Sequence, residues 1–210
     1  MGLGLHGGGV GTVKFLAKNG AVITVTDLRD ARSLAPSIRQ LRNLKGIKYV
    51  LGKHRKEDIV NSDLIVKNPG VRPDSPYLRV AKERGIPVTG DIEIFFNECP
   101  AQIIGITGTR GKSTTAYLIW KFLKTGLAHR SRAATGRRRV WLAGNIRKSA
   151  LELLPRIKKS DLVILELSSF QLEDLARIKK SPRIAAITNI LRDHLNWHKN
   201  FLDYIKAKTR

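Results

Sequence analysis

The stretch Gly105-Ile-Thr-Gly-Thr-Arg-Gly-Lys-Ser-Thr114 decides how this chain folds. It follows the apolar pair Ile103-Ile104 and leads into a helical pattern over Ala116–Leu123. A strand, a glycine-rich turn, Gly-Lys-Ser and a helix together bind a nucleotide triphosphate, because main-chain amides and the helix N-terminus meet the phosphates. The Lys112 ammonium then contacts the outer phosphates and the Ser113 hydroxyl takes a Mg²⁺. The glycines at 105, 108 and 111 depart from the strict Walker spacing.

Strand and helix signals alternate along the whole chain. Before residue 100, strands are expected at 21–26, 48–51, 64–67 and 87–89, with helices at 12–18, 33–43 and 75–84. After it, strands are expected at 102–106, 140–143, 162–167 and 184–188, with helices at 112–124, 148–157, 170–178 and 200–208. This alternation predicts an α/β fold, with a Rossmann-like domain over residues 1–99 and a P-loop-type parallel-sheet domain over residues 100–210.

Both ends of the sequence look cut. A Rossmann-type glycine turn follows a strand, yet Gly2 follows Met1 directly. A helical pattern is still running at Arg210. We therefore expect the first domain to lack its first strand and the sheet of the second domain to be truncated and incomplete.

Composition narrows the class of protein. A single cysteine, Cys99, excludes a disulfide framework and suits a reducing compartment, so a cytoplasmic location is expected. No apolar run approaches the roughly 18 residues of a membrane span, so no membrane partner is expected. The net charge of +22 suits nucleic acid or a polyanionic substrate. Only 6% of the residues are aromatic and no helix-turn-helix or RNA-stacking motif is visible, so nucleic acid is the weaker hypothesis.

The N-terminal glycines suggest a second ligand. Gly2-x-Gly4-x-x-Gly7, followed by Asp27 at a strand end, has the spacing of the dinucleotide fingerprint. A carboxylate at that position accepts hydrogen bonds from ribose hydroxyls or from a base N–H. The alternative is a tight turn between strand and helix with no ligand. The position of Asp27 favours a nucleotide-type ligand.

Candidate metal-binding residues lie at or after the ends of two further strands. Glu166 ends the apolar strand that begins at Leu162. In P-loop proteins, an acid at the end of such a strand holds Mg²⁺. His194 follows the next strand and would emerge at the same sheet edge, as a second metal ligand or a phosphate contact. The other histidines, His198 among them, have no comparable position in the sequence that would indicate a ligand. The spacing of residues does not distinguish Lys208 from other lysines on a helix.

Taken together, these residues resemble the Mur ligases, the ATP-dependent amide-forming enzymes of bacterial peptidoglycan synthesis. The resemblance rests on 105–115, on Leu165-Glu-Leu-Ser-Ser-Phe-Gln-Leu-Glu173 and on Asn189-Ile-Leu-Arg-Asp-His-Leu195, supported by 2–5, 68–71 and 90–94. The run 165–173 indicates the branch that joins D-glutamate to UDP-N-acetylmuramoyl-L-alanine. The similarity covers nearly the whole chain, and the resemblance implies that this sequence does not include the family's C-terminal domain, with the D-glutamate pocket and part of the ATP site.

The resemblance implies roles for individual residues. The ATP site would comprise Gly108, Thr109, Arg110, Gly111, Lys112, Ser113, Thr114 and Asn145. Catalytic roles would fall to Lys112, His194 and Lys208. The Mg²⁺ ligands would be Ser113, Glu166, His194 and Lys208, the last as a carbamate that bridges a second ion. The residues that face the UDP substrate would be Leu5, His6, Asp27, Arg29 and Gly70.

The implied reaction has two steps. ATP phosphorylates the substrate carboxylate, and the amine of D-glutamate then displaces phosphate from the acyl phosphate. A monomer is expected, and without the C-terminal domain we expect no complete ligation. Departures from the family pattern are Arg110 in place of Asn, Arg147 in place of Gly, and a basic insertion over 127–138. Two alternatives are a nucleotide-binding module without turnover and a basic nucleic-acid-binding P-loop protein.

Overall fold

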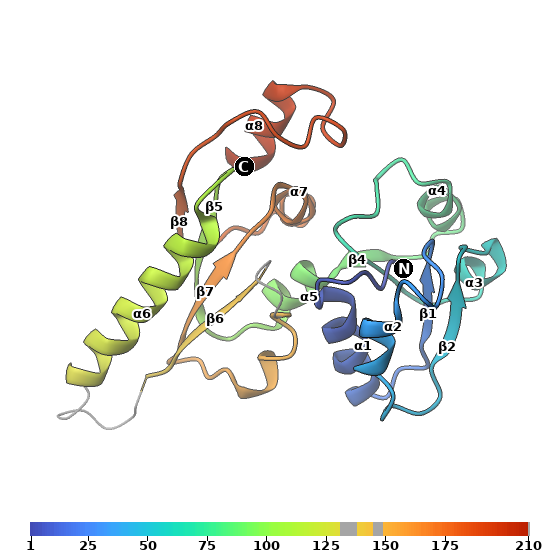
Figure 1. The fold of residues 1–210 in the computed structure, drawn as a ribbon, viewed down its shortest axis with the longest axis horizontal. Coiled ribbons are helices and arrows are strands. Elements are labelled where there is room, and N and C mark those ends of the chain that lie inside the picture. Colours follow the sequence, from blue (N-terminus) through green and yellow to red (C-terminus); the bar gives the residue numbers. More distant parts are fainter. Residues whose placement is uncertain (131–137, 145–148, 210) are drawn as a thin grey trace. The chain divides into compact units, whose positions relative to one another are not determined.

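The structure is a computed structural model that describes residues 1–130, 138–144 and 149–209, with only the backbone of 127–130. Its internal contacts divide the chain into two units. The first comprises Met1–Phe95 and Arg147–Glu152, and the second comprises Phe96–Ile146 and Leu153–Arg210. All the strand pairs in the described chain are parallel, and helices alternate with them (Figure 1). The predicted α/β class with parallel sheets is confirmed.

The first unit alternates short strands and helices. Its strands are β1 (Thr24–Asp27), β2 (Lys48–Leu51), β3 (Ile65–Lys67) and β4 (Val88–Gly90). Its helices are α1 (Gly8–Lys18), α2 (Ala35–Arg39), α3 (Lys56–Val60), α4 (Pro76–Glu83) and α5 (Asp91–Glu98), the last of which runs on into the second unit. β1 pairs with β2 and β3 pairs with β4.

The first residues of the chain lie between these two strand pairs. The Gly2 amide donates to the Thr26 carbonyl in β1 at 2.7 Å. On the other side, the Met1 nitrogen donates to the Val66 carbonyl at 2.9 Å, and the Asn68 amide donates back to the Met1 carbonyl at 2.9 Å. This alternation is the pattern of parallel pairing. Residues 1 and 2 therefore connect β1 to β3, and the sequence runs from there into the glycine turn before α1.

The second unit is built on one four-stranded sheet. Its strands are β5 (Gln102–Thr107), β6 (Val140–Gly144), β7 (Leu162–Glu166) and β8 (Ile184–Ile187), in the spatial order β6-β7-β5-β8. Its helices are α6 (Lys112–Arg130), α7 (Ser169–Arg177) and α8 (Phe201–Thr209). Every residue of β7 is buried, which explains its unbroken apolar run. Among the described helices, none is both long and apolar enough to cross a membrane.

One core holds α6 against this sheet. Its buried members are Ile106, Ala116 and Ile164, and its half-buried members include Ile104, Ile119, Trp120, Leu123, Val140 and Leu142. On α6, positions 116, 119, 120 and 123 recur at helical spacing and face the strands. This packing fixes the start of α6, and with it the glycine-rich loop, at the carboxyl end of β5.

The helix expected at 148–157 is wrong for the part that the structure describes. Residues 149–157 form turns and a single 3₁₀ turn, η1 (Leu154–Arg156). Pro155 has no N–H, so it cannot donate the bond to the Leu151 carbonyl that an α-helix here would need, and Leu151 and Leu153 are buried without one. The sequence prediction also missed α3 and α5, although Ile92, Phe95 and Phe96 are buried at helical spacing.

Candidate nucleotide-binding site

The glycine-rich loop lies where three parallel strands end. Ile106 in β5 pairs with Glu166 in β7, and Thr107 pairs with Ile187 in β8. The loop follows β5 directly, and Lys112 is the first residue of α6. The carboxyl ends of parallel strands share one edge, so the loop, Glu166 and the segment after β8 meet there.

The segment after β8 holds the loop in shape. The Thr109 amide donates to the Asn189 carbonyl at 2.9 Å, and the Arg110 amide donates to Asn189 Oδ1 at 3.0 Å. The Thr188 hydroxyl donates to the Arg110 carbonyl at 2.6 Å. Gly108 has a φ of 144°, and an added Cβ there would overlap the Thr188 hydroxyl. The close approach of these two segments therefore requires glycine at 108.

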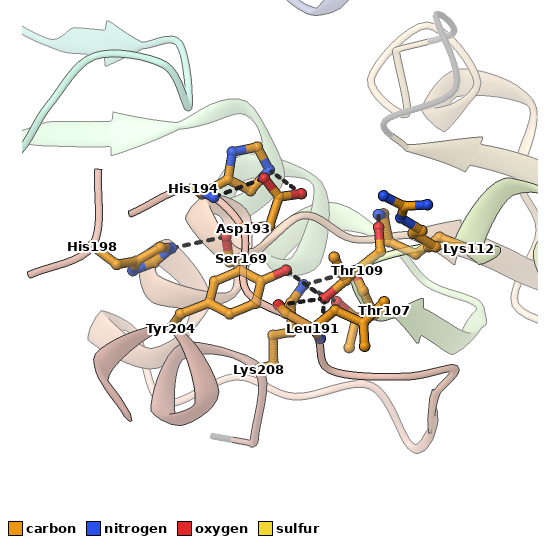
Figure 2. Close-up of polar contacts among 12 residues, drawn as sticks. Thr107, Thr109, Lys112, Ser169, Leu191, Asp193, His194, His198, Tyr204 and Lys208 are labelled. Carbon is orange, nitrogen blue, oxygen red and sulfur yellow. Dashed lines mark hydrogen bonds and ion pairs between the residues drawn. The ribbon is translucent and has the colours of Figure 1, made fainter. Parts of the chain in front are cut away.

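A hydroxyl pair joins the loop to α8. Thr109 Oγ1 lies 2.9 Å from the Tyr204 hydroxyl, and it accepts a hydrogen bond of 2.9 Å from the Leu191 amide (Figure 2). Tyr204 is buried, and burial raises the pKa of its phenol. The sequence analysis missed Tyr204. A signal was present, because Tyr204 precedes Lys208 by four residues and so shares its face of α8.

Two lysines approach the same loop from different helices. Lys112 Nζ donates to the Thr109 carbonyl at 2.8 Å, and Lys208 Nζ donates to the Gly108 carbonyl at 2.8 Å. Lys208 is only 5% exposed. Burial and the Lys112 charge lower the pKa of Lys208 to about 8, against the opposing effect of Asp193. Two cations and the N-terminus of α6, whose first main-chain amides have no intrahelical partner, make this end of the loop suited to an anion.

Glu166 provides an acceptor at this edge. It is 2% exposed, and its Oε2 has no hydrogen-bond donor among the described residues. A buried carboxylate oxygen without a donor is costly unless a cation satisfies it, so the residue fits a metal ligand. Ser113 and Thr114, in the first turn of α6, are exposed, as a ligand that enters from solvent requires.

His194 lies farther out along the segment after β8. Its φ is 52°, and its side chain is 45% exposed. Nε2 lies 3.8 Å from Asp193 Oδ2, beyond hydrogen-bond distance (Figure 2). The ring contacts Phe170, with centroids 5.0 Å apart. The imidazole therefore remains accessible for a ligand. Asn145, Arg147 and 131–137 of the basic insertion lie outside the described residues.

The five substrate residues predicted in the first unit lie at or just after the end of β1, after β3, and in the glycine turn before α1. Asp27 is buried, and its carboxylate accepts the Gly4 and Arg29 amides, each at 2.9 Å. It therefore shapes the glycine turn. The predicted residues Leu5, His6, Arg29 and Gly70 are exposed. A cavity of about 540 Å³ lies instead against α1, β1 and β3, and none of the five predicted residues lines it.

Comparison with known proteins adds independent findings. Residues 106–210 match the Mur ligase middle domain, and residues 1–90 match the Mur ligase MurD-like N-terminal domain. Relatives named "UDP-N-acetylmuramoylalanine--D-glutamate ligase" include those of Roseiflexus sp. (45% identical), Borreliella burgdorferi (43%) and Treponema pallidum (37%). The matches cover 99%, 100% and 99% of this chain but only 42%, 43% and 40% of those relatives.

Among solved structures, a pseudomurein peptide ligase type C from Methanothermus fervidus is similar at 22% identity and a TM-score of 0.38. The match covers 95% of this chain and 39% of that one.

Proposed function

The chain belongs to the Mur ligase family, and on that premise we propose that it carries the nucleotide-binding part of an ATP-dependent, amide-forming ligase. The observation that carries this proposal is the loop between β5 and α6, with Lys112 and Lys208 both donating to its carbonyls. A triphosphate placed against the first main-chain amides of α6 would take the Lys112 ammonium away from the Thr109 carbonyl. It would also relieve the repulsion between the two lysines.

We propose Mg²⁺ as the metal, with Glu166 as its main protein ligand and Ser113 as a second. The buried, donor-free Oε2 of Glu166 supports this assignment. His194 and a carbamylated Lys208 are the proposed ligands of a second ion. Bound Mg²⁺ would neutralise charge on the phosphates, which eases attack on the terminal phosphorus.

For the substrates we propose UDP-N-acetylmuramoyl-L-alanine and D-glutamate, on the strength of the names of the relatives. The substrate carboxylate takes the terminal phosphoryl group of ATP, which gives ADP and an acyl phosphate. The amine of D-glutamate then attacks the acyl carbon, the C–O bond to phosphate breaks, and an amide forms. The lysines and the N-terminal amides of α6 stabilise the negative charge that develops on the transferred phosphoryl group.

The first unit would then bind the UDP part. Leu5, His6, Arg29 and Gly70 are exposed in the segments that follow its strands, and Asp27 holds the Gly4 turn that underlies them. In this assignment Asp27 positions the turn, and the lone pairs left on its carboxylate accept from ribose hydroxyls. We propose that the protein acts as a monomer in the cytoplasm, which suits its single free cysteine.

Nucleotide titration of the whole chain tests the ATP site. We expect Mg²⁺-dependent ATP binding, and we expect Lys112→Ala to weaken it by at least about tenfold, as loss of one charge-assisted contact requires. Lys121→Ala is the matched control, because it removes an exposed cation from the same helix and should change affinity less than about twofold. Equal ATP affinity in the wild type and in Lys112→Ala would refute the proposal.

A second variant tests the metal. Glu166→Gln keeps the size of the side chain but removes its charge, so ATP should still bind while the gain in affinity from Mg²⁺ shrinks. Phosphate release in the presence of both substrates then separates a ligase from a nucleotide-binding module without turnover. ATP binding without phosphate release would favour the module for this chain.

A further inference from the structure

A second cluster of metal-binding side chains lies apart from the loop, around His198. The imidazole is 2% exposed, and its Nδ1 points between two carboxylates. Nδ1 lies 3.5 Å from Glu173 Oε1 in α7 and 3.8 Å from Asp203 Oδ2 in α8. The three ligand atoms all lie within 4.8 Å of one another.

Nothing in the described part of the chain satisfies Nδ1. It is buried and makes no hydrogen bond there, since both carboxylate oxygens are beyond the length of a good one. A buried polar atom with no partner is costly and calls for an explanation. An ion between the three atoms would supply one.

The other ring nitrogen fixes how the imidazole is presented. Nε2 lies 3.0 Å from the hydroxyl of Ser169, which stands four residues before Glu173 on the same face of α7 (Figure 2). When Nε2 donates to this hydroxyl, the lone pair of Nδ1 faces the two carboxylates. Metal-binding histidines are held in this way, with the distal N–H bonded to an outer partner. Burial, which outweighs the attraction of Glu173 and Asp203, lowers the pKa of His198.

The spacing suits a small transition-metal ion. Zinc bonds of about 2.0–2.2 Å in a tetrahedron set ligand atoms roughly 3.4 Å apart. The two measured separations from Nδ1, 3.5 and 3.8 Å, are close to this value. Three protein ligands leave the fourth position to water, and the carboxylates of Glu173 and Asp203 are partly exposed, so an ion can enter. Mg²⁺ prefers oxygen ligands throughout and is a poor match for this set.

The geometry points to a binding site for a divalent transition-metal ion of the zinc class, formed by Glu173, His198 and Asp203. The site joins α7, the segment after β8 and the first turn of α8. The Tyr204 ring packs edge-on against His198, with centroids 5.2 Å apart. An ion here would therefore stabilise the position of the start of α8, the helix that places Tyr204 and Lys208 against the loop.

Titration of the whole, tag-free, chelator-treated chain with Zn²⁺ tests the site, in the absence of nucleotide, which itself binds metals. We expect one Zn²⁺ per chain, a rise in melting temperature on binding, and no displacement by millimolar Mg²⁺. Co²⁺ in place of Zn²⁺ should give the visible absorption of a four-coordinate site. A wild-type chain that binds no Zn²⁺ below about 100 µM overturns the proposal.

Variants assign the ion to these residues. Glu173→Gln and Asp203→Asn each remove one ligand with little change of shape, and each should weaken Zn²⁺ binding by more than the roughly 10–100-fold that an outer partner costs. Ser169→Ala removes only that outer partner, so its loss of Zn²⁺ affinity should fall within this range of roughly 10–100-fold. Glu166→Gln is the control, because it alters the proposed nucleotide-metal carboxylate and should leave Zn²⁺ affinity unchanged. Unchanged affinity in both Glu173→Gln and Asp203→Asn, or its loss in Glu166→Gln, rejects the assignment. Circular dichroism identifies any variant that fails to fold. If one carboxylate variant does not fold, the Zn²⁺ affinity of the other tests the assignment.

Discussion

Lys208 Nζ donates a hydrogen bond of 2.8 Å to the Gly108 carbonyl, across one hundred residues of sequence. The same ammonium lies 3.4 Å from Thr107 Oγ1 and 4.7 Å from the centre of the Tyr204 ring. A cation on α8 is thereby buried against the loop that the second unit presents at its sheet edge. Its desolvation is only partly offset by these contacts, and the pKa of Lys208 falls from 10.5 to about 8.

The first prediction concerns stability at alkaline pH. The pKa of Lys208 is lower in the folded chain than in the unfolded one, so between pH 8 and 10.5 the unfolded state holds more protons. Stability therefore rises with pH in this window, and this group adds no slope below it. We expect the free energy of unfolding of the wild type, relative to Lys208→Met, to rise by about 1–3 kcal/mol across the window. Denaturant titrations at pH 7.5 and 10.5 measure it, and a constant difference would exclude the lowered pKa.

The second prediction concerns the carbamate proposed on Lys208. CO₂ reacts with the neutral amine, and a pKa of about 8 leaves roughly a quarter of this lysine neutral at pH 7.5, far more than an ordinary lysine. Incubation with ¹³C-bicarbonate should give a carbamate carbonyl resonance that is missing from Lys208→Met. Lys206→Met is the control, since Lys206 is exposed on the same helix. A signal that persists in Lys208→Met would place the carbamate elsewhere.

Sequence reasoning predicted the parts of the site that follow from local pattern. The loop and the strand that ends at Glu166 each carry a periodic or glycine signal, and both lie at the common sheet edge. Long-range partners carry no such signal. The bonds of Thr188 and Asn189 to the loop, and of Tyr204 to Thr109, depend on how β8 and α8 pack, which residue spacing does not encode.

The same limit applies to His198. In the sequence it is one of several histidines with no motif or spacing that indicates a functional role. The capping box of Ser168 and Gln171 starts α7 so that Ser169 and Glu173 share the face that meets His198. The helix expected at 148–157 is absent from the described residues 149–157. Pro155 lacks the N–H that a helix would need, although the apolar spacing of the segment is that of a helix.

The third prediction concerns the hydroxyl pair that joins the loop to α8. Thr109→Val keeps the shape of the side chain but removes the partner of Tyr204 and of the Leu191 amide. We expect a loss of about 1–3 kcal/mol in the free energy of unfolding, because a main-chain amide is left unpaired. Tyr204→Phe should cost less, about 0.5–1.5 kcal/mol. The double variant should lose less free energy of unfolding than the sum of the two single losses. Full additivity would show that the pair does not interact.

The fourth prediction compares two glycines in the left-handed region of backbone conformation. Gly144 ends β6 with a φ of 108°, and an added Cβ would overlap the Glu166 carbonyl oxygen in the neighbouring strand. Gly85 has a φ of 68° and open space around it. Gly85→Ala should therefore cost about 1 kcal/mol for its backbone conformation alone, and Gly144→Ala should cost several times more. Similar losses in thermal or denaturant unfolding would show that the strand spacing at Gly144 is looser than the structure has it.

The last prediction concerns Asp161, which is buried just before β7. Burial by itself raises the pKa of this carboxyl. Hydrogen bonds from the Trp141 indole at 2.9 Å and from the Lys158 and Arg139 amides at 3.0 Å outweigh burial, so the pKa lies below its usual value. Because the folded pKa is the lower one, the stabilisation is present above the ordinary pKa of an aspartate and is lost as pH falls through the folded value.

Asp161→Asn should thus cost about 2–4 kcal/mol near neutral pH, since charge-assisted bonds become neutral and one amide loses its acceptor. The gap between the wild type and the variant should close as the pH falls below about 4. Glu98→Gln is the matched control, an exposed carboxylate of the same unit whose loss should change stability by less than about 0.5 kcal/mol at any pH. Denaturant unfolding at pH 7 and pH 3 distinguishes the two variants. A pH-independent loss in Asp161→Asn would show that Asp161 stabilises the turn by its shape alone.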